Sequence, residues 1–411
     1  MSRLSPSSAT SSPKPLSGAA LVRDYALLAG ALLLIGQWIA IHAVARGALG
    51  PVASTVLPGL AIFGAATLLS WGAELAQLEI AQALALAGLA LVAVLPEYAV
   101  DMYLAWKAAK EPAYTAYAAA NMTGANRLLI GMGWSTVLLV YWLRTRARQI
   151  TVKPAQRLEL LTLLLATGYA FFIPFKRTLS LLDTAFFLAL FVFYIRRASQ
   201  GHVEEPGLAG PPDRLALLPR RWRRLATWAL FVLPAYAIVI SAEPFADGLL
   251  HNARRLGIEE FILIQWLAPL ASESPEFIVA VIFALRRNPT AGLGTLISSK
   301  VNQWTLLVGM LPLVYAISGM HVAPMVLDAR QAEEVFLTAA QSLLALVVLA
   351  NLSFGLGEAL LLLGLFVLQF LWPTPEIRTL LGYGYLVVTV GYLLNPAFRR
   401  SVVALVRFGW R

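Results

Sequence analysis

Residues 267–276 read Leu-Ala-Pro-Leu-Ala-Ser-Glu-Ser-Pro-Glu, which places two carboxylates, two hydroxyls and two prolines inside an apolar segment. The flanking residues 261–266 and 277–282 are apolar enough for a membrane interior. An ionised side chain at the centre of a bilayer costs about 2.5–3.5 kcal/mol on insertion scales. Two acids in one helical turn therefore need a compensating partner, and a bound cation is the simplest candidate.

The same pattern occurs in the first half of the chain, where residues 91–97 read Leu-Val-Ala-Val-Leu-Pro-Glu. Each Pro-Glu is followed by a second apolar segment dotted with polar residues, 121–131 and 298–309 respectively. Both of these segments end in Leu-Leu, a β-branched residue and Gly. Related motifs in the same order indicate an internal duplication, and matching interrupted helices in two halves indicate a transporter's binding site.

The composition indicates an all-α polytopic membrane protein. Hydrophobic residues make up 59% of the chain and charged residues 13%, against roughly 45–50% and about 25% in soluble domains. There is no cysteine, which excludes disulfides and thiolate metal sites. In a membrane protein the net charge of +10 indicates basic cytoplasmic loops rather than nucleic-acid binding.

About twelve apolar segments, each near the ~20 residues that cross a bilayer, follow along the chain. They lie roughly at 25–45, 54–75, 83–107, 114–143, 158–175, 179–195, 225–249, 259–285, 291–318, 332–352, 355–373 and 379–396. A cytoplasmic N-terminus places more than twice as many Lys and Arg residues on the cytoplasmic side as on the other. Both termini are then cytoplasmic, in the plasma (inner) membrane, and the two Pro-Glu helices cross in opposite directions.

The duplication is therefore predicted to be an inverted repeat of five-helix units, with extra helices at the termini. The predicted order is a disordered cytoplasmic tail (1–20), a first half (21–197) with a repeat at about 83–143, a basic cytoplasmic linker (198–224), a second half (225–396) with a repeat at about 259–318, and a basic cytoplasmic tail (397–411).

Proline inside a helix removes a hydrogen bond and displaces the carbonyl four residues earlier. For Pro96 that carbonyl belongs to Val92, and for Pro275 it belongs to Ala271. Freed carbonyls beside carboxylates are hard oxygen ligands, which suit Ca²⁺, Na⁺ or a similar ion. We therefore expect these two carbonyls to serve as backbone ligands.

The acids of each motif share a helix face. Glu97 and Asp101 are four residues apart, and Glu273 and Glu276 are three residues apart. Inverted repeats bring such faces together near the middle of the membrane. We expect one cation site there.

The paired motifs resemble the α-repeats of the calcium:cation antiporter superfamily, the sodium/calcium exchanger membrane region. That family usually reads Gly-Thr-Ser-Leu-Pro-Glu, then Gly-Asn-x-x-Gly-Ser-Asn-x-x-Asn. The matching residues are Leu95-Pro96-Glu97 and Pro275-Glu276 for the first motif, Asn121, Gly124 and Asn126 for the second, and Ser299 and Gln303 at the family's serine and final Asn-or-acid positions.

The chain departs from the family pattern in both halves. Val92-Ala93-Val94 replaces Gly-Thr-Ser in the first repeat, and Ala271-Ser272-Glu273 replaces it in the second. Ala125 replaces a serine, Lys300 stands where Asn is usual, and Arg127 follows Asn126. Hydroxyls that the family uses for ions are thus missing from the first repeat.

The resemblance implies a cation antiporter, not an enzyme, which moves Ca²⁺ or a similar cation in exchange for H⁺ or Na⁺ by alternating access. Its partners are then inorganic cations and the bilayer, with no cofactor beyond the transported ions. We expect Glu97 and Glu276 to bind the metal ion. Further expected ligands are Asp101, Asn121, Asn126, Ser272, Glu273, Ser299 and Gln303, with Arg127 and Lys300 as compensating charges.

Two other interpretations remain at the sequence level. Glu97 and Glu276 could be structural acids paired with Arg127 and Lys300, because charges inside membranes often pair. Paired acids also line cation channels, although a fixed pore does not need an inverted repeat. Between the two coupling ions, the missing hydroxyls and the surplus of acids over bases favour H⁺, since an empty acidic site would take up protons.

Overall fold

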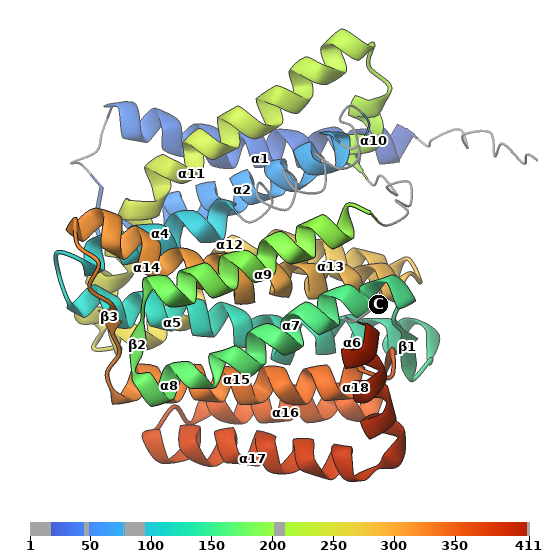
Figure 1. Ribbon diagram of the computed structural model, residues 1–411. Coiled ribbons are helices and arrows are strands. Elements are labelled where there is room, and N and C mark those ends of the chain that lie inside the picture. The colour runs from blue at the N-terminus through green and yellow to red at the C-terminus, as the bar shows by residue number, and fades with distance from the viewer. Residues whose placement is uncertain (1–17, 45–48, 77, 79–94, 201–209, 409–411) are drawn as a thin grey trace, which may run out of the picture.

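The computed structural model of the protein describes residues 18–44, 49–76, 78, 95–200 and 210–408 (Figure 1). Nearly all regular structure in these residues is helical. The α-helices are α1 (Gly18–Val44), α2 (Ala53–Ala76), α4 (Leu95–Ala108), α5 (Ala113–Leu128), α6 (Ser135–Thr145), α7 (Arg157–Ala170), α8 (Phe172–Lys176), α9 (Leu181–Ala198), α10 (Pro211–Ala216), α11 (Arg220–Leu256), α12 (Glu260–Leu285), α13 (Pro289–Asn302), α14 (Val308–Gly319), α15 (Ala329–Leu349), α16 (Leu356–Leu371), α17 (Pro375–Leu394) and α18 (Pro396–Phe408).

Short elements join or interrupt these helices. They are the π-helical turns η1 (Leu129–Trp134) and η3 (Gln303–Leu307), the 3₁₀ turn η2 (Pro154–Gln156), and the strands β1 (Gln149–Thr151), β2 (Thr178–Leu179), β3 (Met325–Val326) and β4 (Ser353–Gly355). One π-helical turn occurs in each half: η1 overlaps the end of the polar-dotted segment 121–131, and η3 lies within the segment 298–309. Such turns are frequent at functional sites.

Two antiparallel ribbons join the halves of the chain at opposite ends of the molecule. β1 pairs with β4, and β2 pairs with β3. In Figure 1, β2 and β3 lie at one end of the helices and β1 lies at the other. Each ribbon takes one strand from the first half and one from the second, which is the arrangement expected for repeats that interlock.

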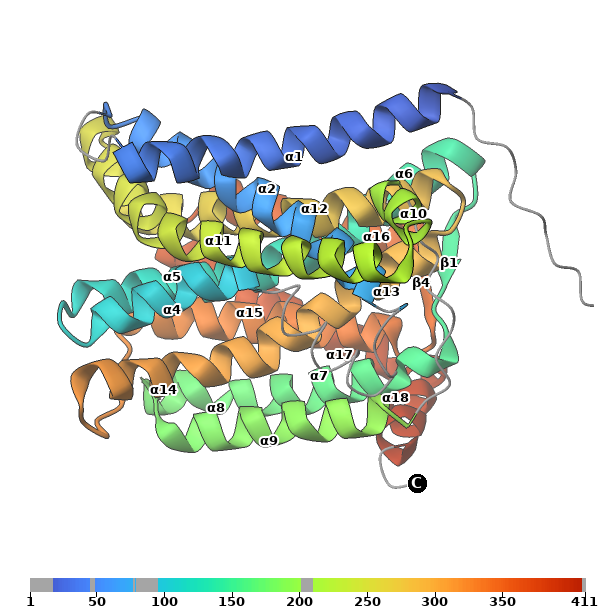
Figure 2. The same cartoon turned by 90° about the horizontal axis from the view of Figure 1, so that it is seen from above.

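The helices form two packing units. α1, α2 and α11 share an apolar cluster of their own, which includes Ile35, Leu68, Leu75 and Ile238. Figure 2 shows α1, α2 and α11 gathered on one side of the molecule. The remaining spans pack around a much larger apolar core that centres on α5, α12, α13 and α15. This core also includes Ile62 of α2 and Phe245, Ala246, Leu249 and Leu250 of α11.

Eight described helices are long and apolar enough to cross a membrane, or up to nine if the bent α12 is taken as one span. α16 is apolar but shorter, and residues 79–94 of the predicted span at 83–107 lie outside the described residues. The all-α, multi-pass fold class is confirmed, while the number of twelve spans stays a prediction.

α12 bends by 58° between Glu260–Ser274 and Glu276–Leu285. The bend falls at the second Pro-Glu pair, as expected when a proline removes a hydrogen bond of the helix. The stretch 267–276 therefore contains the point at which this span is broken.

Both segments predicted as polar connections contain helices. α10 lies within the predicted linker, and its Arg214 side chain donates two hydrogen bonds to Asp24 of α1, at 2.9 and 3.0 Å. The predicted C-terminal tail forms α18. A hydrophilic segment can still fold when charged and apolar side chains find partners on neighbouring spans.

Candidate cation-binding site

The candidate site lies where α4, α5, α12 and α13 pack against one another. Gly124 of α5 marks the closest approach, because a Cβ atom added there would lie 1.8 Å from the carbonyl oxygen of Gln265 on α12. Only glycine lets the two backbones come this near. The glycine of the first repeat is thereby explained as a packing residue that brings the two repeats together.

Three carboxylates of the two repeats are buried at this crossing. Glu97 is 3% exposed, and Asp101 and Glu273 are fully buried. Glu97 lies within electrostatic reach of both Asp101 and Glu276, and Glu273 lies within reach of Glu97 and Glu276. The acids that the sequence grouped on two separate helices therefore share one region.

Most oxygens of these acids have no protein partner. The Nε2 atom of Gln303 donates to Oε2 of Glu97 at 3.0 Å. Within the described residues, the other oxygen of Glu97 and both oxygens of Asp101 and Glu273 accept no hydrogen bond of good geometry, although the Asn121 amide lies beside Asp101 and the Gln303 amide beside Glu273. Because buried polar atoms are nearly always satisfied, this cluster of free acceptors is typical of a site completed by something other than the protein.

Glu276 is half-buried and has a different environment. Its Oε2 atom accepts a long hydrogen bond from the Ser299 hydroxyl, at 3.4 Å. This contact joins the two motif segments of the second repeat across α12 and α13. Two of the expected ligands, Glu276 and Ser299, are thus neighbours in the structure.

Lys300 contacts an amide rather than a carboxylate. Its ammonium group donates to Oδ1 of Asn126 at 2.6 Å and lies 4.4 Å from the centroid of the Trp304 ring. The Nδ2 atom of Asn126 donates to the carbonyl of Met122 at 2.8 Å. Among the described residues Lys300 forms no ion pair, although Glu273 and Glu97 lie within electrostatic reach of it.

The smaller predicted ligands have mixed environments. The Ser272 hydroxyl donates back to the carbonyls of Ala268 and Pro269, which leaves its lone pairs available. The Asn121 amide lies beside Asp101, yet neither its nitrogen nor its oxygen has a hydrogen-bond partner of good geometry in the described part of the chain.

The structure describes one of the two predicted backbone ligands. Val92 lies outside the described residues. The Ala271 residue is half-buried in α12, one turn before the bend.

Arg127 corrects the sequence interpretation, which treated it as a compensating charge of the site. Its guanidinium forms a buried ion pair with Glu334 of α15 at 2.5 Å and donates to Oε1 of Gln369 at 3.0 Å. It also lies 5.1 Å from the centroid of the Trp266 ring. Arg127 is therefore engaged by a dedicated acid on another helix, and among the described residues it forms no ion pair with the repeat carboxylates.

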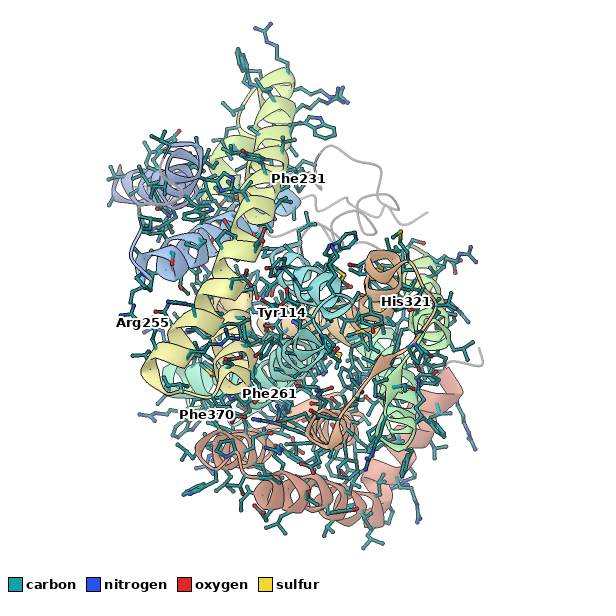
Figure 3. The ribbon with its side chains drawn as sticks, turned by 90° about the vertical axis from the view of Figure 1, so that its left-hand side faces the viewer. Tyr114, Phe231, Arg255, Phe261, His321 and Phe370 are labelled. Carbon is teal, nitrogen blue, oxygen red and sulfur yellow. The ribbon has the colours of Figure 1, made fainter. Side chains whose placement is uncertain are left out.

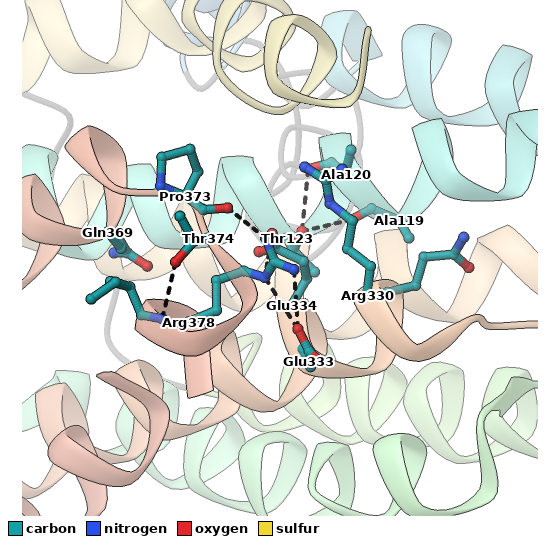
Figure 4. A network of polar contacts seen from close by, with 12 residues as sticks. Ala119, Ala120, Thr123, Arg330, Glu333, Glu334, Gln369, Pro373, Thr374 and Arg378 are labelled. Atoms are coloured by element: carbon teal, nitrogen blue, oxygen red, sulfur yellow. Dashed lines mark hydrogen bonds and ion pairs between the residues drawn. The ribbon is translucent and has the colours of Figure 1, made fainter. Parts of the chain in front are cut away.

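Sequence reasoning did not identify the network around Arg127. Gln341 donates to the carbonyl of Arg127 at 3.1 Å and accepts from Gln369 at 3.1 Å. Arg378 extends the network to Glu333, as Figure 4 shows together with Glu334 and Gln369. The available signal was polar residues inside the apolar segments 332–352 and 355–373, but nothing in the sequence indicates their partner.

A second missed contact ties the two packing units together. Asp247 of α11 accepts hydrogen bonds from Tyr103 of α4 at 2.8 Å and from Tyr114 of α5 at 2.9 Å. Figure 3 shows Tyr114 among the central helices beneath α11.

No group of three or more acidic or histidine side chains in the described part of the chain already surrounds one point as a metal shell. The arrangement instead offers several buried, unsatisfied oxygens within reach of one lysine. Chemically, such a cluster can exchange a cation for protons, since either one relieves the repulsion among the acids.

Comparisons with known proteins agree with the repeats. The family described as sodium/calcium exchanger protein matches residues 51–199 and 226–374. The crystal structure of the H⁺/Ca²⁺ exchanger CAX is 42% identical, covers 94% of this chain and 97% of that chain, and has a TM-score of 0.90. No curated protein sequence matches the chain.

More distant structures show the same fold. Two structures of the sodium-calcium exchanger NCX_Mj are 19% and 17% identical, each covers 78% of this chain and 98% of that chain, and their TM-scores are 0.52 and 0.53. All of these relatives are exchangers rather than enzymes. The resemblance inferred from the two Pro-Glu motifs is confirmed: the chain is a multi-pass membrane protein that belongs to the sodium/calcium exchanger family, within the calcium:cation antiporter superfamily.

Proposed function

We propose that this protein exchanges Ca²⁺ for H⁺, with the cation bound by Glu97 and Glu276 between the two repeats. The observation that carries the proposal is the set of unpaired oxygens on Glu97, Asp101 and Glu273, which are buried together. Carboxylate and carbonyl oxygens are the ligands that Ca²⁺ takes in proteins. The likeness to an H⁺/Ca²⁺ exchanger over 94% of the chain supports Ca²⁺ and H⁺ as the two exchanged ions.

Protons are favoured over Na⁺ as the returning ion for a physical reason. Ionised carboxylates buried together repel one another, so an empty site gains stability by taking up protons. The first repeat has Val92-Ala93-Val94 where the family has hydroxyl-bearing residues. A Na⁺ ion would therefore find fewer neutral oxygen ligands, while a proton needs none.

The alternative in which Glu97 and Glu276 are structural acids paired with Arg127 and Lys300 has less support. No ion pair joins Glu97, Asp101, Glu273 or Glu276 to a base among the described residues, and the nearby arginine is paired with Glu334. Charges kept only for structure are expected to pair in this way, as Arg127 does. The repeat acids do not.

Alternating access would use the two packing units. α1, α2 and α11 share an apolar cluster, although α11 also contributes Phe245 and Leu249 to the larger core, and they contact the rest largely through α4 and α12. A rigid-body movement of this unit against the other would open the site to either side. We place both termini in the cytoplasm and the protein in the plasma membrane, on the asymmetry of basic residues.

The deciding experiment is ⁴⁵Ca²⁺ uptake into proteoliposomes, first under an imposed Na⁺ gradient and then under an imposed pH gradient. We expect the pH gradient to drive uptake at least as well as the Na⁺ gradient. Uptake that depends strictly on Na⁺ and does not respond to the pH gradient would indicate sodium/calcium exchange instead. Uptake that needs no counter-ion would identify a channel instead.

A further inference from the structure

A cavity of about 600 Å³ lies between the start of α7 and the C-terminal helix α18. Its lining includes four arginines, Arg157, Arg399, Arg400 and Arg407, together with the apolar side chains of Val403 and Phe408. None of these residues belongs to the candidate cation site. The cavity is of the size that holds small ligands in proteins, roughly 300–1,000 Å³.

The four arginines are exposed and have no acidic partner. Among the described residues none of them forms an ion pair, and the one side-chain hydrogen bond is from Arg400 to the carbonyl of Pro396, at 3.2 Å. Elsewhere, arginines of this chain do find acids, as Arg127, Arg214 and Arg378 show. The cavity thus gathers guanidinium groups whose positive charge is compensated by no acid in the part of the chain that the structure describes.

The helix α18 presents two different faces. Leu405 is buried against the body of the protein, whereas Arg399, Arg400, Val403 and Arg407 lie on the exposed side. Residues three, four and seven positions apart share one helix face, so charge and apolar surface alternate on the side that lines the cavity. A helix of this kind lies in the plane of a membrane interface.

The position of α18 agrees with such an interface. It follows directly after the membrane span α17, and in Figure 1 it lies beside α7 at the end of the molecule that carries β1. This end also holds Arg144 in the last turn of α6, and Arg146 and Arg148 directly after it. A helix that follows a membrane span at this end of the molecule lies next to the lipid headgroups of one leaflet.

The structure assigns this cavity to the phosphate headgroup of an anionic phospholipid, which binds the four arginines while its acyl chains begin along Val403 and Phe408. Guanidinium groups match phosphate oxygens with paired hydrogen bonds, and each basic residue near an anionic membrane surface contributes about 1 kcal/mol. A zwitterionic headgroup offers the same phosphate but no net charge. The cavity is therefore expected to prefer anionic lipid.

The test uses the full-length protein in detergent and native mass spectrometry, with phosphatidylglycerol and phosphatidylcholine of the same acyl chains as probes. The wild type should retain phosphatidylglycerol at least about tenfold better than phosphatidylcholine, given three or four basic contacts. The variant R399Q/R400Q/R407Q should lose this preference. The control R144Q/R196Q/R197Q removes three charges from the same side of the protein, outside the cavity, and should keep it.

Three outcomes would overturn the assignment. They are an unchanged preference in R399Q/R400Q/R407Q, an equal loss in the control, and binding of inorganic phosphate to the wild type without any preference for phosphatidylglycerol, which would indicate a soluble anion. A measurement on the wild type needs no variant to fold: photoactivatable phosphatidylglycerol should label α18 or the start of α7. Labelling confined to other segments would contradict the site.

Discussion

Arg127 and Glu334 form an ion pair 2.5 Å long, and each of the two side chains is 2% exposed. They come from α5, the motif helix of the first repeat, and from α15, which follows the second repeat. The pair joins the region of the cation site to the C-terminal spans. Because Arg127 is engaged by Glu334, Lys300 is the basic side chain that lies within electrostatic reach of Glu97 and Glu273 in the described part of the chain.

The ion pair leads to a prediction about stability. Arg127→Met would leave the buried Glu334 with only a longer contact to Arg378, at 3.7 Å, among the described residues, which is expected to lower the free energy of unfolding by up to about 3–5 kcal/mol. The double variant Arg127→Met/Glu334→Met removes both charges and should recover much of that loss. Thermal unfolding in detergent measures both effects. Equal destabilisation by the single and the double variant would show that the pairing does not matter.

Removing one repeat carboxylate should abolish transport without unfolding the protein. Glu97→Gln or Glu276→Gln keeps the side-chain shape but removes a charged oxygen ligand of the proposed cation site. ⁴⁵Ca²⁺ flux in proteoliposomes should fall to background, while thermal stability stays near that of the wild type. Glu111→Gln, an exposed acid paired only with Lys107, is the control and should transport normally. Wild-type flux in either site variant would refute the proposed ligands.

Lys300 is expected to set the pH range of transport. Its ammonium group lies within electrostatic reach of Glu97 and Glu273 and contacts Asn126. Lys300→Met removes a positive charge that favours ionised acids, so proton release becomes harder and the pH for half-maximal Ca²⁺ uptake should move upward. Lys300→Arg keeps the charge and should leave the midpoint near its wild-type value. A midpoint unchanged in Lys300→Met would exclude the lysine from proton coupling.

Gly124 should not tolerate a side chain. A Cβ atom there would lie 1.8 Å from the carbonyl oxygen of Gln265, so Gly124→Ala must push α5 away from α12. We expect loss of flux and a lower unfolding temperature. Gly364→Ala in α16 is the matched control, since nothing lies within 4 Å of its added Cβ, and it should be neutral or slightly stabilising. Similar effects at both glycines would contradict the proposed close approach.

The predicted topology can be tested directly, because the chain has no cysteine of its own. Single cysteines at Ser199, after α9, and at Ala323, between α14 and α15, should react with a membrane-impermeant reagent from opposite sides. Ser199 is expected on the cytoplasmic side. Reaction of both from the same side would contradict the twelve-span arrangement.

The sequence by itself determined the fold class, the duplication and the family. These depend on local patterns: apolar runs near the length of a span, and two Pro-Glu motifs in the same order. The break in α12 also followed from the sequence, because a proline acts on its own helix.

Only the tertiary structure decided which charges meet. From the sequence Arg127 and Lys300 looked equivalent, since each stands in the second motif segment of its repeat. In the folded chain Arg127 reaches Glu334, while Lys300 stays with Asn126 beside the repeat acids. Such pairings depend on which helices face one another in the folded chain, and the paired residues can be hundreds of positions apart in the sequence. Hydrophobic periodicity describes only the local element, so it does not predict them. The arginine-lined cavity has the same origin, because α18 must fold back onto α7 to create it.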